Sequence, residues 1–148
     1  GLAAAIGSVQ VRRLPEWHTA RQRNAMILAK ALSTCSALRV PMPPDNMTHA
    51  WYRFYAFVDP DRLKNGWDRD RILAALSDRG QTAFSGSCPE IYNEGVFRTR
   101  GFTPGSPLPA AQELGRTSLA FRVDPTLELG DMHAMADALC DVMKTATR

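Results

Sequence analysis

A polar loop near the middle of the chain carries the side chains best suited to binding a substrate. Its hydroxyl and carboxyl groups belong to Ser85, Ser87, Glu90 and Tyr92. Such groups can orient a polar ligand through hydrogen bonds, and the loop is bounded by segments that we expect to be structured. We therefore take these four residues as the candidate substrate-binding set. A loop held only by its own turn hydrogen bonds is an equally good interpretation of the same residues.

Groups that could catalyse a reaction or hold a metal are scattered along the chain. The three histidines are far apart and fit no metal-ligand spacing, and the three cysteines form no CxxC pair. Cys88 could act as a nucleophile, but no sequence feature supplies the base that would activate it. No glycine-rich phosphate-binding pattern is present. We expect no metal site and no catalytic residue in this chain.

Two helices are expected in the first 32 residues. The alanine-rich segment 1–12 predicts one helix, and a bend is expected near Leu14. Pro15 suits the first turn of the second helix because proline has no amide proton to leave unpaired there. Four apolar residues share one face of the first helix because their spacings are three and four. They are Leu2, Ala5, Ile6 and Val9.

Local signals mark three further helices. Asp68 is a predicted N-cap, and Gly80 lies just past the end of the helix that follows it. A short helix is expected over residues 110–114, closed by Gly115. The last helix begins near Gly130, and its apolar stripe is expected to pack in the core. That stripe comprises Met132, Met135, Ala136, Leu139 and Met143.

Short segments of aromatic and β-branched character predict the strands. Residues 38–40 and 82–85 suggest short strands, and the aromatic run 49–59 suggests a central strand covered on both faces. Residues 118–123 alternate and predict a strand with one buried face. Between the predicted strands 82–85 and 118–123, residues 86–109 suggest a long ordered loop with at most short helical turns. The fold class is α+β, with a small, mainly antiparallel sheet covered by helices.

Composition fits one globular domain over residues 1–148. The chain is 45% hydrophobic and 22% charged, which is typical of a folded protein with one core. Its formal net charge is +3 without a block of like charges, so no nucleic-acid partner is indicated. No apolar stretch approaches the roughly 20 residues of a membrane span. The odd number of cysteines suits reduced thiols in the cytoplasm.

Seven sequence blocks are distributed along nearly the whole chain. They are AAAIGSVQ (3–10), RLPEW (13–17), RQRNA (21–25), HAWYRFY (49–55), SGSCPEIY (85–92), SLAF (118–121) and DPTL (124–127). In this order they resemble successive blocks of the DegT/DnrJ/EryC1/StrS aminotransferases.

The resemblance implies the carboxy-terminal small domain of a pyridoxal-phosphate enzyme that transfers an amino group to a keto-sugar nucleotide. In such an enzyme a large domain of the same chain carries the cofactor on a lysine, and the enzyme is a homodimer. Residues 1–14 would then form the interdomain helix, with their apolar face covered by the large domain. Lys30, Lys64 and Lys144 match no cofactor motif. The chain alone is therefore expected to bind no pyridoxal phosphate and to lack activity.

Two departures from the family pattern leave the substrate open. Common members carry an HYxPLH-like segment where this chain has residues 85–91, so Ser85 fills a histidine position. Ala120, Arg122 and Asp124 also replace residues that are usually apolar or histidine. A freestanding α+β binding module without enzymatic activity remains the alternative.

Overall fold

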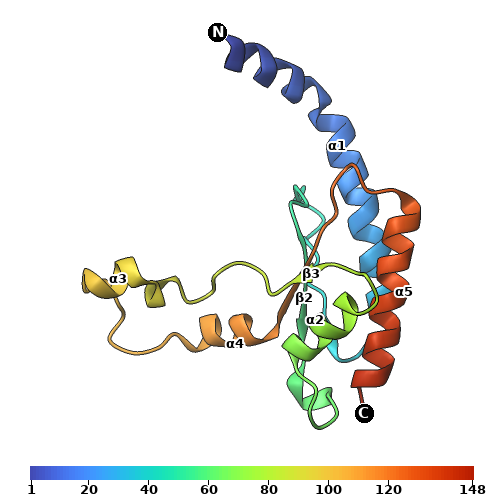
Figure 1. Ribbon diagram of the computed structural model, residues 1–148. Coiled ribbons are helices and arrows are strands. Elements are labelled where there is room, and N and C mark those ends of the chain that lie inside the picture. Colours follow the sequence, from blue (N-terminus) through green and yellow to red (C-terminus); the bar gives the residue numbers. More distant parts are fainter.

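A four-stranded antiparallel sheet and five α-helices make up the computed structural model, which describes residues 1–148 (Figure 1). The α+β prediction is confirmed. The helices are α1 (Leu2–Leu32), α2 (Arg69–Ser77), α3 (Gly95–Thr99), α4 (Pro109–Thr117) and α5 (Leu129–Ala146), with single 3-10 turns η1 (Pro60–Arg62) and η2 (Ile91–Asn93). The strands are β1 (Leu38–Arg39), β2 (Phe54–Val58), β3 (Ala83–Phe84) and β4 (Ser118–Phe121).

The sheet has the order β1-β2-β4-β3, so β2 lies inside it, as expected for the aromatic run. Because side chains alternate along a strand, β2 places Phe54 toward the helices and Tyr55 on the opposite, open face. Phe54 is fully buried and Tyr55 is half-buried. The prediction that both faces of this segment are covered is therefore met in full on one face only, because the other is half-buried. Only one face of β2 belongs to the core.

The opposite correction applies to β4, for which one buried face was expected. All four of its residues are buried. Leu119 and Phe121 enter the core, whereas Ser118 and Ala120 lie on the open face. The chain at Gly86 passes close over Ser118, where an added Cβ would lie 3.1 Å from the serine hydroxyl. Small side chains under a closely crossing backbone explain the burial.

Helices α1, α2 and α5 cover the core face of the sheet (Figure 1). The predicted stripe of α5 is confirmed, and Val142 and Ala146 extend it. From α1 the core receives Ala25, Leu28 and Leu32. Each large aliphatic side chain buried in this way contributes about 1.5–3 kcal/mol to folding. The helix–sheet interface therefore carries most of the apolar stabilisation.

Helix α1 is continuous through Pro15, so the expected division into two helices is wrong. Proline cannot donate to the carbonyl of Val11, and its ring crowds that turn. The helix axis changes direction about halfway along, in agreement with the bend expected near Leu14 (Figure 1). All of residues 1–16 are exposed, and the apolar face is open to solvent, with Leu2 79% exposed.

Side-chain caps fix the two helices next to the sheet. The Asp68 carboxylate accepts a hydrogen bond from the Arg71 amide at 2.8 Å, which confirms the predicted N-cap of α2. Gly80 follows that helix with a φ of +73°, a conformation that glycine adopts without strain. Glu128 and Asp131 form a reciprocal capping box at the start of α5. No helix of the structure has the length and apolar character that crossing a membrane requires.

Residues 86–117 form an arm that extends away from the sheet (Figure 1). It contains η2, α3 and α4, and it agrees with the expected loop of short helical turns. Helix α4 runs past Gly115, where the sequence predicted its end. An added Cβ at Gly115 would lie 2.6 Å from the Pro89 ring. This glycine therefore permits a close approach between the two sides of the arm and does not terminate the helix.

Candidate functional site

The structure places two of the four predicted site residues where the arm leaves the sheet. The Ser85 carbonyl accepts hydrogen bonds from the Ser118 hydroxyl at 2.5 Å and from the Arg69 guanidinium at 3.3 Å. The side chains of Ser85 and Ser87 are exposed and make no hydrogen bond within the chain. Their hydroxyl groups are therefore free to contact a ligand.

The other two residues, Glu90 and Tyr92, lie further along the arm and contact each other. The Tyr92 hydroxyl donates to the Glu90 carboxylate at 2.5 Å and accepts from the Leu108 amide at 3.3 Å. Because the phenol donates to an anion, the pKa of Tyr92 is raised above its ordinary value. These bonds join the two sides of the arm. The structure thus joins Glu90 to Tyr92 by a hydrogen bond. Ser85 and Ser87 lie apart from this pair, where the arm leaves the sheet.

Cys88 lies between the pairs and donates its thiol to the Glu94 carboxylate at 3.3 Å. This hydrogen bond, with burial and the charge of Glu94 adding to it, raises the pKa of the thiol. A nucleophilic cysteine needs the opposite shift. The structure also contains no group of three or more histidine, cysteine or acidic side chains placed to hold a metal ion.

A shallow hollow of about 240 Å³ lies on the open face of the sheet. Its wall includes Ser87, the one member of the predicted set that borders it. Arg53 stands between two aromatic rings, with its guanidinium carbon 5.0 Å from the centre of Phe84 and 5.4 Å from that of Tyr52. The complete lining is Tyr52, Arg53, Tyr55, Phe84, Gly86, Ser87 and Ala120.

Gly86 allows the chain to cross beside this hollow. It has a φ of +92°, and an added Cβ would lie 3.1 Å from the Tyr55 ring. Any larger residue would be strained and would press on the sheet face. The glycine therefore keeps the path that brings Ser87 beside Arg53.

The turn before β2 is strained and firmly held. Trp51 has a φ of +49°, a left-handed conformation that costs a non-glycine residue about 1–3 kcal/mol. Its amide donates to His49 Nδ1 at 3.0 Å, and the His49 carbonyl accepts from His18 Nε2 at 2.7 Å. The Trp51 ring is buried, whereas Tyr52 is 73% exposed. The turn thus buries one aromatic ring and presents the next one to solvent.

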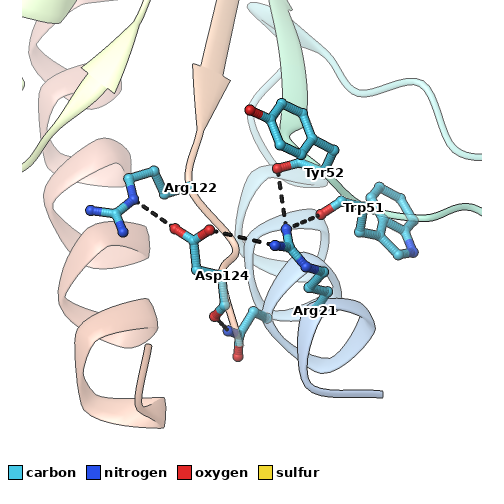
Figure 2. Close-up of polar contacts among 6 residues, drawn as sticks. Arg21, Trp51, Tyr52, Arg122 and Asp124 are labelled. Atoms are coloured by element: carbon cyan, nitrogen blue, oxygen red, sulfur yellow. Dashed lines mark hydrogen bonds and ion pairs between the residues drawn. The ribbon is translucent and has the colours of Figure 1, made fainter. Parts of the chain in front are cut away.

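An arginine from α1 fixes this turn, as Figure 2 shows. Arg21 Nη1 donates to the carbonyls of Trp51 at 3.1 Å and Tyr52 at 3.4 Å. Its Nη2 lies 3.7 Å from Asp124 Oδ1, and Arg122 Nε donates to the other carboxylate oxygen at 2.6 Å. We call the contacts of Arg21 with Asp124 and the two carbonyls the Arg21 clamp. It joins the middle of α1, the turn and the segment after β4.

Sequence reasoning missed both the clamp and the hollow. Arg21 and Asp124 lie 103 positions apart, and Arg53 and Phe84 lie 31 positions apart. Neither pair forms a local motif. Asp124 entered the sequence analysis as part of the block DPTL and as a departure from the family pattern, without a structural role. Its signal was an acidic residue directly after a buried strand, which gains meaning only once α1 is known to pack beside it.

The family model for the DegT/DnrJ/EryC1/StrS aminotransferase family matches residues 1–140. The chain belongs to this family. The predicted resemblance is thereby confirmed.

Relatives within the DegT/DnrJ/EryC1/StrS family agree with the fold. An aminotransferase from Psychrobacter cryohalolentis is 36% identical with a TM-score of 0.91, over 96% of this chain and 38% of that one. The aminotransferase TlmJ from Streptoalloteichus hindustanus is 26% identical with a TM-score of 0.82, over 97% and 36%. The dTDP-4-dehydro-2,3,6-trideoxy-D-glucose 4-aminotransferase of Saccharopolyspora spinosa is 26% identical over 92% of this chain and 32% of that relative. The chain spans about a third of each relative.

Replacing Arg21 by glutamine tests the clamp. The variant loses the charge that faces Asp124 and the donor that two carbonyls share. We expect the free energy of unfolding, measured with urea, to fall by about 1.5–3 kcal/mol, the range for hydrogen bonds to charged groups. Arg13→Gln, in the exposed part of the same helix, is the control and should stay within about 0.5 kcal/mol. Equal losses in both variants would contradict the clamp.

Replacing Glu90 by glutamine tests the hydrogen bond to Tyr92. A neutral acceptor no longer holds the phenol proton, so the raised pKa of Tyr92 should return toward 10.0. The raised pKa in the folded state stabilises the arm fully below pH 10, and this contribution is lost as the pH rises further. Absorbance at 295 nm follows the titration. Glu94→Gln, which does not contact Tyr92, should leave the curve unchanged, and a curve unchanged in Glu90→Gln would refute the bond.

Proposed function

We propose that this chain is the carboxy-terminal small domain of a pyridoxal-phosphate-dependent aminotransferase that acts on a keto-sugar nucleotide. The observation that carries the proposal is the family match over residues 1–140. One relative, about three times as long as this chain, is named as an aminotransferase of a dTDP-linked dehydro sugar. The domain borders the substrate cleft and supplies polar contacts to the sugar nucleotide.

The cofactor belongs to the large domain, which is the partner of this one in the same chain. Pyridoxal phosphate serves as an electron sink and needs a lysine that can be deprotonated. Lys144 pairs with Asp141 at 2.9 Å, which raises its pKa, and Lys64 donates to the Thr145 carbonyl at 2.8 Å. Lys30 is exposed on α1. These lysines do not fit the cofactor, and no step of the reaction is assigned to them.

Within this proposal, residues 1–14 form the interdomain helix. Their side chains are exposed, and Leu2, Ile6 and Val9 present an apolar face that the large domain would cover. The complete enzyme is a homodimer in the cytoplasm and binds neither nucleic acid nor a membrane.

The four predicted residues face the substrate cleft in this proposal. Ser85 and Ser87 have hydroxyl groups without an intramolecular partner, which suits contacts to sugar hydroxyls or phosphate. Glu90 and Tyr92 stiffen the arm through their mutual bond and offer the remaining lone pairs. Substrate orientation is their role, because the reacting groups lie on the cofactor.

Amino transfer by the complete enzyme tests the function. Glutamate and a panel of keto-sugar nucleotides should give 2-oxoglutarate and an amino sugar. Alanine at Ser85, Ser87, Glu90 or Tyr92 should lower kcat/KM by about 3- to 30-fold, as expected for one or two lost hydrogen bonds. Ser106→Ala, an exposed serine on the same arm, is the matched control. No transfer to any keto-sugar nucleotide would refute the function, and four unchanged variants would remove the site alone.

Trapping with borohydride tests whether the 148-residue chain holds the cofactor by itself. We expect no stoichiometric pyridoxyl adduct, because each lysine is paired or fully solvated. Mass spectrometry of the reduced chain measures the adduct and its position. One pyridoxyl group per chain on a single lysine would overturn the assignment of the cofactor to the large domain.

A further inference from the structure

We propose that the hollow on the open face of the sheet is the subsite for the diphosphate group of the substrate nucleotide, with Arg53 as its anion-binding residue. The nature of the ligand rests on the proposed function. The existence of an anion site rests on the structure of this chain alone. The two parts can therefore fail separately.

Arg53 differs from every other arginine of the chain in its surroundings. Three arginines are half-buried, namely Arg21, Arg53 and Arg69. Arg21 pairs with Asp124, and Arg69 pairs with Asp70 at 2.6 Å and donates to the Ser118 carbonyl. Arg53 makes no hydrogen bond and no ion pair. No side-chain nitrogen of Arg53 is sealed from solvent, so its N–H donors are open to an anion that enters the hollow.

Two aromatic rings hold the Arg53 guanidinium in a defined place. Its carbon lies 5.0 Å from the centre of Phe84 and 5.4 Å from that of Tyr52, within the range of cation–π attraction. The guanidinium lies over both rings, and none of its N–H donors has a hydrogen-bond partner in the chain. A planar, fixed fork of donors matches two oxygens of a phosphate. Arg53 is thus prepared for an anion rather than for a sugar hydroxyl.

The sheet register creates space beside this guanidinium. Ala120 of β4 pairs with Tyr55 on one side and Phe84 on the other, so a small side chain forms the floor between two larger ones. The hollow contains no carboxylate, and Ser87 adds a hydroxyl to its wall. Its volume of about 240 Å³ lies below the roughly 300–1,000 Å³ of sites that enclose a complete ligand. It suits one charged group of a larger molecule.

The Arg21 clamp explains why this arrangement is stable. It holds the carbonyl of Tyr52, the residue directly before Arg53. With Trp51 in the left-handed conformation, its ring packs in the core and the ring of Tyr52 is exposed. Arg53 is therefore positioned from α1 and from the segment after β4, as well as by the start of β2 that follows it.

Titration of the 148-residue chain with dTDP, inorganic pyrophosphate and thymidine tests the subsite. In ¹H–¹⁵N spectra, dTDP and pyrophosphate should shift the Arg53 Nε signal and the Ser87 amide in a saturable way, and thymidine should not. Arg53→Gln should weaken the binding of both anions at least 10-fold. Arg53→Lys keeps the charge but loses the planar pair of donors. Its affinity for both anions should lie between that of the parent chain and that of Arg53→Gln. A dispersed spectrum for each variant verifies folding.

Arg39→Gln is the matched control, because Arg39 lies on the same open face with its guanidinium carbon 4.4 Å from the centre of Phe57. It borders no part of the hollow, so binding should be unchanged. Absence of a saturable shift, equal weakening in Arg39→Gln, or equal binding of thymidine would overturn the proposal.

The complete enzyme separates this proposal from the proposed function. Arg53→Gln should raise KM for a sugar nucleotide about 10-fold and leave the conversion of glutamate to 2-oxoglutarate in the first half-reaction unchanged. An unchanged KM would overturn the subsite while the aminotransferase function stands. If the protein binds anions at Arg53 but aminates no sugar nucleotide, the anion site is supported and the proposed function is refuted.

Discussion

The contact between the Arg21 guanidinium and the carbonyls of Trp51 and Tyr52 determines how the two layers of the domain meet. The core face of the sheet holds α1 by apolar packing, which has little directional preference. The guanidinium adds direction, because its donors must meet carbonyls of one particular turn. Asp124 holds the same group from the segment after β4. The left-handed Trp51 persists because its neighbours on three elements determine its conformation together.

The two faces of the sheet differ in composition and in exposure to solvent. The face toward α1, α2 and α5 is filled with aliphatic and aromatic side chains that exclude water. The open face combines arginines, tyrosine and phenylalanine with the small residues Ser118 and Ala120. Packing on one face supplies the stability that lets the other keep a charged side chain without a partner.

Sequence patterns predicted what short-range physics controls. The cap at Asp68 and the stripe of α5 depend on residues within a few positions, and both were correct. The division at Pro15 was wrong because the remaining helical hydrogen bonds outweigh one missing donor. The burial of β4 depends on the crossing at Gly86, which no alternation pattern contains. The Arg21 clamp and the Arg53 hollow join distant segments, so only the fold could reveal them, and the roles of Ser85, Ser87, Glu90 and Tyr92 stay predictions.

The bend at Pro15 divides α1 into an exposed segment before the proline and a segment after it that packs on the sheet. Residues 2–15 extend about 20 Å at 1.5 Å per residue, and no side chain of this part is buried. One backbone hydrogen bond is missing at Pro15, so bending there costs less than bending elsewhere in the helix. A change of about 10° in the bend angle moves the far end by about 3.5 Å at this length. Arg21 lies six positions beyond Pro15, so the clamp anchors the part of α1 from which residues 2–15 project.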